Sequence, residues 1–101
     1  MPKKTNFVVD ERDNVTTILQ EGLLKGSKIE VKYGENSEFI ELVDQIKYGH
    51  KVAIKPIKNG EKITKYGLTI GIANRNIDIG EHVHIQNVES IRGRGDLAKG
   101  R

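Results

Sequence analysis

The 101-residue sequence contains no cysteine and no tryptophan, and its aromatic side chains are two phenylalanines and three tyrosines. Without cysteine the chain forms no disulfide bond and offers no thiolate to a metal, which fits a reducing compartment. Because aromatic rings are few, the core of a single domain of this length must be built from isoleucine, valine and leucine. No apolar run approaches the length of a membrane span, and the first residues, MPKKTNFVVD, lack the apolar segment of a signal peptide. We therefore expect a cytoplasmic protein without membrane contact.

The excess of positive charge is small. The net charge is +3, and much of it lies in Lys3-Lys4 and in the closing segment RGRGDLAKGR. Proteins that bind nucleic acid usually carry a denser basic patch or aromatic platforms for the bases, so we expect no nucleic-acid partner. A nucleophile elbow, a Walker loop, a Rossmann glycine fingerprint and a zinc-ribbon spacing are all missing from the sequence. These absences favour a subunit or an accessory domain over a complete enzyme.

Strand-like segments make up most of the sequence. NFVVD, residues 6–10, is typical of a short strand. The next segment, DNVTTILQEGLLKG (13–26), predicts a helix, because its apolar residues recur at helical spacing, Asp13 or Asn14 can cap its start and Gly26 can end it. From residue 28 onward, short segments alternate or run apolar and are separated by glycine or Asn-Gly. The pattern predicts a mostly-β domain with one short helix.

A short repeat recurs within the β-patterned region. IKNGEKI (57–63) and IDIGEHV (77–83) share the pattern Ile-x-x-Gly-Glu-x-Ile/Val, and LLKGSKI (23–29) is a looser copy with serine in place of glutamate. The repeat indicates a recurring turn that leads into a strand, in a compact β fold with pseudo-symmetric halves. We expect Glu61 and Glu81 to be hydrogen-bond acceptors in these turns rather than catalytic acids.

Two of the three histidines lie one residue apart, in GEHVHIQ. Because side chains alternate along a strand, His82, His84 and Gln86 should share one face, while Val83 and Ile85 face the core. Two imidazoles placed in this way are about 6–7 Å apart at Cβ, close enough to share a metal ion or an anionic substrate. Such pairs also arise without any function, and a metal site needs a third ligand.

The third histidine, His50, directly follows Gly49 at the start of the strand HKVAIKP. Lys51 and Lys55 lie on the polar face of this strand, where their ammonium groups could neutralise a carboxylate or a sulfonate. A solvated strand face is the alternative interpretation, both here and at Lys65.

The segment GHKVAIKPIKNGEKITKYGLTIGIANRNIDIGEHVHIQNV resembles the N-terminal domain of altronate and galactarate dehydratases and the small subunit of sulfolactate sulfo-lyase. The similarity covers about 40 contiguous residues in full motif order. The residues that carry it are Gly49 to Ala53, Lys65 to Gly67, Ile70-Gly71, Gly80 to His84, and Asn87. At Gln86 many relatives have another histidine.

The resemblance implies a SAF domain, a β-clip fold, over residues 1–91, followed by a basic, glycine-rich tail at 92–101. It also implies elimination chemistry: loss of water from a sugar acid such as altronate or galactarate, or loss of sulfite from sulfolactate. The implied cofactor is Fe(II) or another divalent metal. The implied partner is a large dehydratase-like subunit, on which the tail either docks or is disordered, and a homo-oligomer is possible.

Candidate roles follow from the resemblance together with the chemistry of elimination, which needs a base, an acid for the leaving group and positive charge for the enediolate. The candidates for metal contact or proton transfer are His50, His82 and His84. Of these, His82 and His84 are the expected metal ligands and His50 is the best third partner. Lys51, Lys65 and Asn87 are expected to orient the acid. The alternative is a non-catalytic β-clip module that binds a carboxylate or a protein and in which the histidines are incidental.

Overall fold

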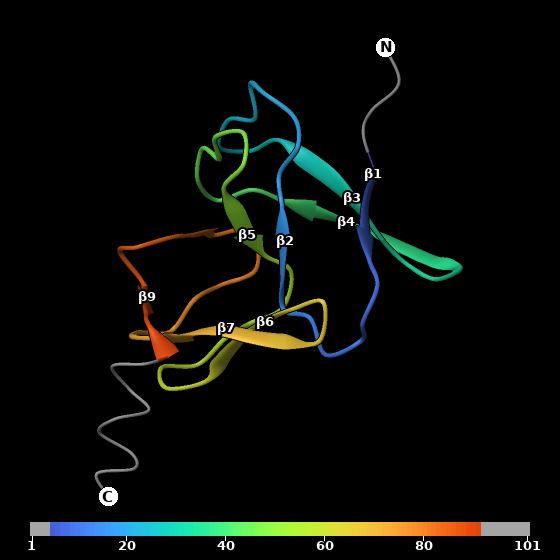
Figure 1. The fold of residues 1–101 in the computed structure, drawn as a ribbon. Coiled ribbons are helices and arrows are strands. Elements are labelled where there is room, and N and C mark those ends of the chain that lie inside the picture. The colour runs from blue at the N-terminus through green and yellow to red at the C-terminus, as the bar shows by residue number, and fades with distance from the viewer. Residues whose placement is uncertain (1–4, 92–101) are drawn as a thin grey trace, which may run out of the picture.

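A computed structural model describes residues 5–91 of the chain. Nine short strands form three small sheets, with the orders β1-β3-β4, β2-β5-β8 and β6-β7-β9. The strands are β1 (Thr5–Val8), β2 (Val15–Thr17), β3 (Lys28–Tyr33), β4 (Asn36–Glu41), β5 (Lys51–Ala53), β6 (Lys62–Lys65), β7 (Leu68–Ala73), β8 (His82–Val83) and β9 (Val88–Glu89). Figure 1 shows β2 and β5 in the middle, with β3 and β4 on one side and β6 and β7 on the other. The mostly-β prediction is confirmed, while the predicted tail at 92–101 lies outside the described residues.

The helix predicted for residues 13–26 is wrong. Val15–Thr17 forms strand β2, which pairs antiparallel with β5. Val15 to Ile18 are four consecutive β-branched residues, whose stiff side chains favour an extended backbone. Val15 and Ile18 are buried in two different apolar clusters, as expected for a strand in the middle of the molecule. Burial on both sides of this segment outweighs its helix-like spacing.

The two residues expected to cap that helix support a distant hairpin instead. The carboxylate of Asp13, which is buried, accepts the backbone N–H groups of Tyr66 (2.9 Å) and Gly67 (2.8 Å). The side chain of Asn14 bonds two backbone groups of β6. Aspartate and asparagine satisfy free N–H groups in turns as readily as at helix starts. They therefore fix the β6–β7 hairpin against β2.

The predicted turn repeat is present, and it has a fourth copy, IKYGHKV (46–52). The glycines of the four copies, Gly26, Gly49, Gly60 and Gly80, have φ angles between +85° and +91°. The copies associate in pairs, with bridges between Leu23 and Ile46 and between Ile57 and Ile77. Only glycine adopts such angles without strain.

The residue after each glycine determines how the turn is closed. Ser27 Oγ accepts the N–H of Leu24 at 3.1 Å. Glu61 Oε1 and Glu81 Oε1 accept the N–H three residues earlier, at 2.7 and 2.9 Å, which confirms their predicted role. In the fourth copy this position belongs to His50, whose ring bonds another histidine.

Strand β5 separates two apolar clusters. Val52 belongs to the cluster beneath β3 and β4, and the next residue, Ala53, belongs to the cluster beneath β6 and β7. Both clusters consist of aliphatic side chains, as the scarcity of aromatic residues predicts, with Tyr33 at the edge of the first. Because both faces of β5 are packed, the position of the residues at its start is well defined. Among the described residues, no helix has the length and apolar character needed to cross a membrane.

Candidate metal and substrate site

The three histidines meet at one end of the β2-β5-β8 sheet. His50 ends the fourth turn directly before β5, and His82 begins β8. Antiparallel pairing of these strands places Val52 opposite His82, so the two imidazoles come together although 32 residues separate them. One potential ligand nitrogen from each of the three rings lies within 4.8 Å of the others. The prediction that His82 and His84 point to a common side agrees with this arrangement.

Two different contacts join the rings. His50 Nδ1 lies 2.8 Å from His82 Nε2, and the ring centroids are 5.1 Å apart with an interplanar angle of 14°. At that separation the two imidazoles meet edge to edge through a hydrogen bond. His84 instead stacks on His50, with centroids 4.1 Å apart and an angle of 17°. His50 and His82 are half-buried and His84 is exposed, so the cluster opens on the side of His84.

The loop after β8 differs from the predicted strand. β8 ends at Val83, and residues 84–87 form a turn. Ile85, expected in the core beside Val83, is 82% exposed. The cause is Asn87, which has no exposed surface: its Oδ1 accepts the N–H of His84 at 3.0 Å, and its Nδ2 donates to the carbonyl of His82 at 2.9 Å. Asn87 therefore lies beneath the histidines and holds the backbone that carries them.

Gln86 contacts His82 directly. Its Nε2 lies 3.1 Å from the carbonyl oxygen of His82 and 3.2 Å from His82 Nδ1. Because a carbonyl can only accept, this end of the amide is the NH₂ group, which donates to Nδ1 as well. The ring proton of His82 then resides on Nε2, which donates to His50 Nδ1. On its other side, Asp44 Oδ2 accepts the backbone N–H of His82 at 3.0 Å.

The surroundings keep these imidazoles neutral. The pKa of His50 is lowered from its ordinary value by burial, and then by the neighbouring His84, Lys47 and Lys51. The pKa of His82 is lowered by burial and by the other two histidines, against an opposing effect of Asp44. Neutral imidazole is the form that accepts a proton or binds a metal.

The donor set fits a divalent metal. Three imidazoles with neighbouring nitrogens match three-ligand sites that leave positions open for substrate or water. Gln86, which donates to His82 Nδ1, and Asp44, which accepts the backbone N–H of His82, hold this residue in place. Imidazole suits iron, zinc, copper and nickel alike, so the donor set fits Fe(II) without selecting it.

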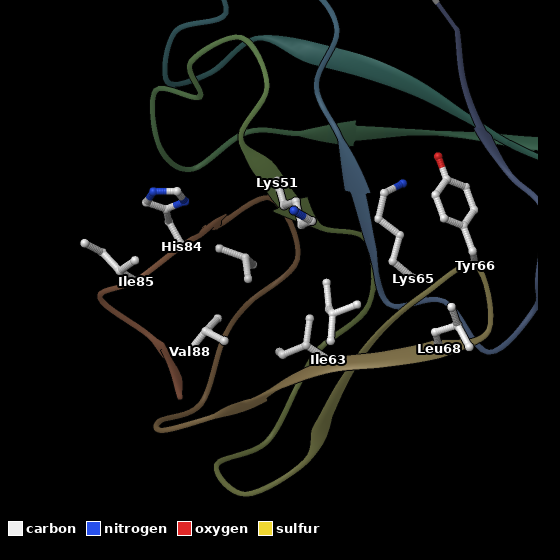
Figure 2. Close-up of a pocket in the computed structure, with 10 residues that line it drawn as sticks. Lys51, Ile63, Lys65, Tyr66, Leu68, His84, Ile85 and Val88 are labelled. Atoms are coloured by element: carbon white, nitrogen blue, oxygen red, sulfur yellow. The ribbon is translucent and has the colours of Figure 1, made fainter. Parts of the chain in front are cut away.

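Two predicted substrate residues lie beside the cluster. Lys51 and Lys65 line a pocket of about 500 Å³ together with His84. Figure 2 shows His84, Lys51, Lys65 and Tyr66 along one side of this pocket, with Ile85, Val88, Ile63 and Leu68 along the other. Lys55 points elsewhere and donates to the carbonyl of Glu11.

Sequence reasoning did not identify Asp44 as part of this region, and it assigned no contact to Tyr66 or to Gln86. Tyr66 has a φ of 55°, unusual for a residue with a side chain, and its ring lies 4.0 Å from Lys65 Nζ. In the sequence, Tyr66 precedes a glycine in the same way that Asn59 precedes Gly60. The pattern therefore indicates a turn at Tyr66-Gly67 and no further role for the tyrosine. Gln86 was expected on the face of the histidines, but its bond to His82 depends on the turn at 84–87.

The mostly-β fold with its three small sheets is consistent with a SAF domain, and comparison with known proteins specifies the family. The altronate/galactarate dehydratase SAF domain family matches residues 4–91, and the chain belongs to this family. The resemblance inferred from the sequence is thus confirmed.

Several characterised lyases contain this domain. The chain is 39% identical over 87 residues to altronate dehydratase of Bacillus subtilis (strain 168), covering 86% of this chain and 16% of that enzyme. It is 34% identical over 90 residues to (2R)-sulfolactate sulfo-lyase subunit alpha of Chromohalobacter salexigens, covering 86% of this chain and 96% of that subunit. Altronate dehydratase of Escherichia coli (strain K12) is 35% identical over 78 residues, which are 15% of its length. The chain therefore spans only a small part of the altronate dehydratases that it matches.

Proposed function

We propose that this chain contributes a three-histidine site to a hydroxy-acid lyase that removes water from a sugar acid such as altronate or galactarate. The observation that carries the proposal is the meeting of His50, His82 and His84 at the edge of a pocket that also presents Lys51 and Lys65. His84, Lys51 and Lys65 line the pocket, and His50 and His82 lie against His84. Such a gathering is hard to attribute to surface chance, since the cluster is built from two turns far apart in sequence.

The main catalytic part is proposed to be a separate, larger unit. The matched relatives are lyases; one of them is named as a subunit, and in the altronate dehydratases the matching region is a small share of the chain. By analogy, the SAF domain here works beside a large dehydratase-like part.

The chemistry assigned to the chain follows from its groups. Dehydration requires removal of the proton next to the carboxylate, departure of a hydroxyl and stabilisation of the enediolate. Lys51 and Lys65 supply positive charge for the substrate carboxylate. A neutral histidine of the cluster can accept or return a proton, and Asn87 positions His82 and His84 through their backbone.

A divalent metal, Fe(II) by family resemblance, would be held by His50, His82 and His84. When bound, such an ion supplies Lewis acidity to a substrate oxygen. Burial lowers the pKa of His50 and of His82, which favours the neutral form that a metal requires.

A second candidate is the elimination of sulfite from sulfolactate. It is favoured by the match to nearly the whole length of a sulfo-lyase subunit. The two candidates share a carboxylate and the requirement for positive charge, so the pocket fits both. Assays with altronate, galactarate and sulfolactate, using the chain together with the catalytic part of the lyase from the same organism and ferrous iron, distinguish them.

The site is tested in the same complex with the His82→Ala/His84→Ala double variant. Turnover should fall by at least about 100-fold, the usual contribution of a lost acid–base or metal group, while assembly with the catalytic part is retained. Gln45→Ala, an exposed polar change outside the cluster, serves as the control. Normal turnover in the double variant would instead support the non-catalytic binding module.

A further inference from the structure

The pocket beside the histidines has two chemically different walls. Figure 2 shows the polar side chains on one side and aliphatic side chains on the other. On the aliphatic side, Leu68 is 66% exposed and Ile85 is 82% exposed, and Ile70 is also exposed. Resting on the function proposed above, we propose that this aliphatic wall, formed by Leu68, Ile70 and Ile85, is the surface on which the catalytic part of the lyase docks.

Ile85 is presented to solvent by a turn that several hydrogen bonds hold in place. The buried amide of Asn87 bonds the backbone on both sides of Val83, and Gln86 bonds His82. Val83, two residues before, is buried in the core, so an ordinary strand would have buried Ile85 as well. Single exposed aliphatic residues are common, but three around one pocket indicate an interaction surface.

A sugar acid does not match this wall. Its hydroxyl groups would face aliphatic carbon and lose hydrogen bonds to water without replacement. The opposite wall, with Lys51, Lys65 and His84, offers the polar partners that such a substrate needs. The two walls therefore suit two different occupants, the acid on one side and an apolar protein segment on the other.

The charges at the pocket argue against a second copy of the chain as that occupant. None of the described residues that line the pocket is acidic, and two are lysines. A symmetric dimer through this face would bring the same lysines toward each other, which is unfavourable. A neutral or acidic surface of the catalytic part meets no such repulsion. The surface also continues directly to His84, the exposed member of the cluster.

Docking at this wall would close the pocket over His84, the histidine that lines it. Elimination chemistry gains from such closure, because excluding water strengthens the interaction of the lysines with the substrate carboxylate. The aliphatic wall thus accounts for how an open, exposed His84 becomes part of an enclosed site.

The test measures binding of the chain to the purified catalytic part of the lyase from the same organism by isothermal titration calorimetry. Ile85→Ser and Leu68→Ser should each weaken binding by about tenfold or more, as expected for exposed aliphatic anchors at the centre of an interface. Ile79→Ser is the matched control, because Ile79 is an exposed isoleucine in another turn and does not line the pocket; its affinity should equal that of the unchanged chain. Circular dichroism confirms that the variants remain folded.

The outcomes separate this proposal from the proposed function. Unchanged affinity in Ile85→Ser and Leu68→Ser overturns the docking surface and leaves the function in place. If the unchanged chain does not bind the catalytic part, both the proposed function and the proposed docking partner are overturned. Self-association of the chain that Ile85→Ser abolishes, measured by sedimentation velocity, overturns the proposal in favour of a second copy. The His82→Ala/His84→Ala variant should bind normally while losing turnover.

Discussion

His50 Nδ1 and His82 Nε2 lie 2.8 Å apart because two copies of one turn deliver their strands side by side. His50 follows the glycine of the copy at 46–52, and His82 follows Glu81 in the copy at 77–83. The same backbone arrangement thus gives a hydrogen bond within the turn at Glu81 and a contact with another histidine at His50. This comparison within one molecule leads to the first prediction.

Replacing His50 with glutamate should restore the turn contact found in two other copies. A carboxylate at this position can accept the N–H of Lys47, as Glu61 accepts that of Lys58. We expect His50→Glu to be more stable than His50→Ala by about 0.5–1.5 kcal/mol, the usual net value of one hydrogen bond, while both variants lose activity. Urea denaturation followed by circular dichroism measures the difference. Equal stability of the two variants would show that the fourth turn does not share the geometry of the others.

Gln86 is expected to select the ring nitrogen that His82 presents to the cluster. Its NH₂ group donates to Nδ1, so Gln86→Ala should shift the His82 ring-nitrogen resonances toward a mixture of tautomers. Nitrogen-15 NMR of the ring nitrogens measures this change directly. Gln45→Ala provides the matched control on an exposed site. Ring-nitrogen shifts that stay as in the unchanged chain would argue against this role.

Stability should depend on pH through the cluster. The pKa values of His50 and His82 are lowered below their ordinary value of 6.5, so the unfolded chain takes up protons before the folded chain does. The free energy of unfolding should therefore fall as the pH decreases from about 7.5 to about 5. Above the pKa of the unfolded histidines, this loss of stability should be absent. Denaturation curves at several pH values measure the slope. A His50→Ala/His82→Ala variant should give a shallower one, and an identical slope would contradict the assignment.

Substitutions at Gly80 and Gly60 separate the cost of a side chain colliding with its neighbours from the cost of a positive φ angle. Both have φ near +90°, but a Cβ at Gly80 would collide with the carbonyl oxygen of Glu41, whereas a Cβ at Gly60 meets open space. Gly60→Ala should cost about 1–2 kcal/mol for the left-handed conformation. Gly80→Ala should cost about 1–3 kcal/mol more because backbone must move. Similar losses in both variants, measured by urea denaturation, would rule out the close approach at Glu41.

The sequence predicts the strands better than it predicts their ends. Glycine-punctuated alternation after residue 28 identifies the β elements, because turns and half-buried strands depend on nearby residues. The segment at Val15–Thr17 was assigned to a helix, since its apolar spacing fits both structures and its burial between two clusters depends on distant strands. Likewise, strand parity correctly pairs His82 with His84 but misplaces Ile85, because the turn that exposes it depends on the bonds of Asn87.

The sequence indicates which histidines form the candidate site, but it does not indicate how they contact one another. Spacing brings His82 and His84 together, and only the family resemblance points to His50 as the third partner. The pairing of β5 with β8 is what brings His50 to the other histidines. This long-range relationship cannot be seen from the alternation along one segment. The repeat contains a local indication of this pairing, because the copy at 46–52 is equivalent to the one at 77–83.

The side chain that follows the glycine in each of the four turns can vary without a change in the backbone of the turn. Serine or glutamate there closes the turn with a side-chain hydrogen bond, and histidine in the same place bonds a second histidine instead. In all four copies, the backbone N–H of the residue after the glycine donates to the carbonyl three residues earlier, whether that residue is serine, glutamate or histidine. Substitution at these four positions should therefore change the surface chemistry of the domain while its turns remain.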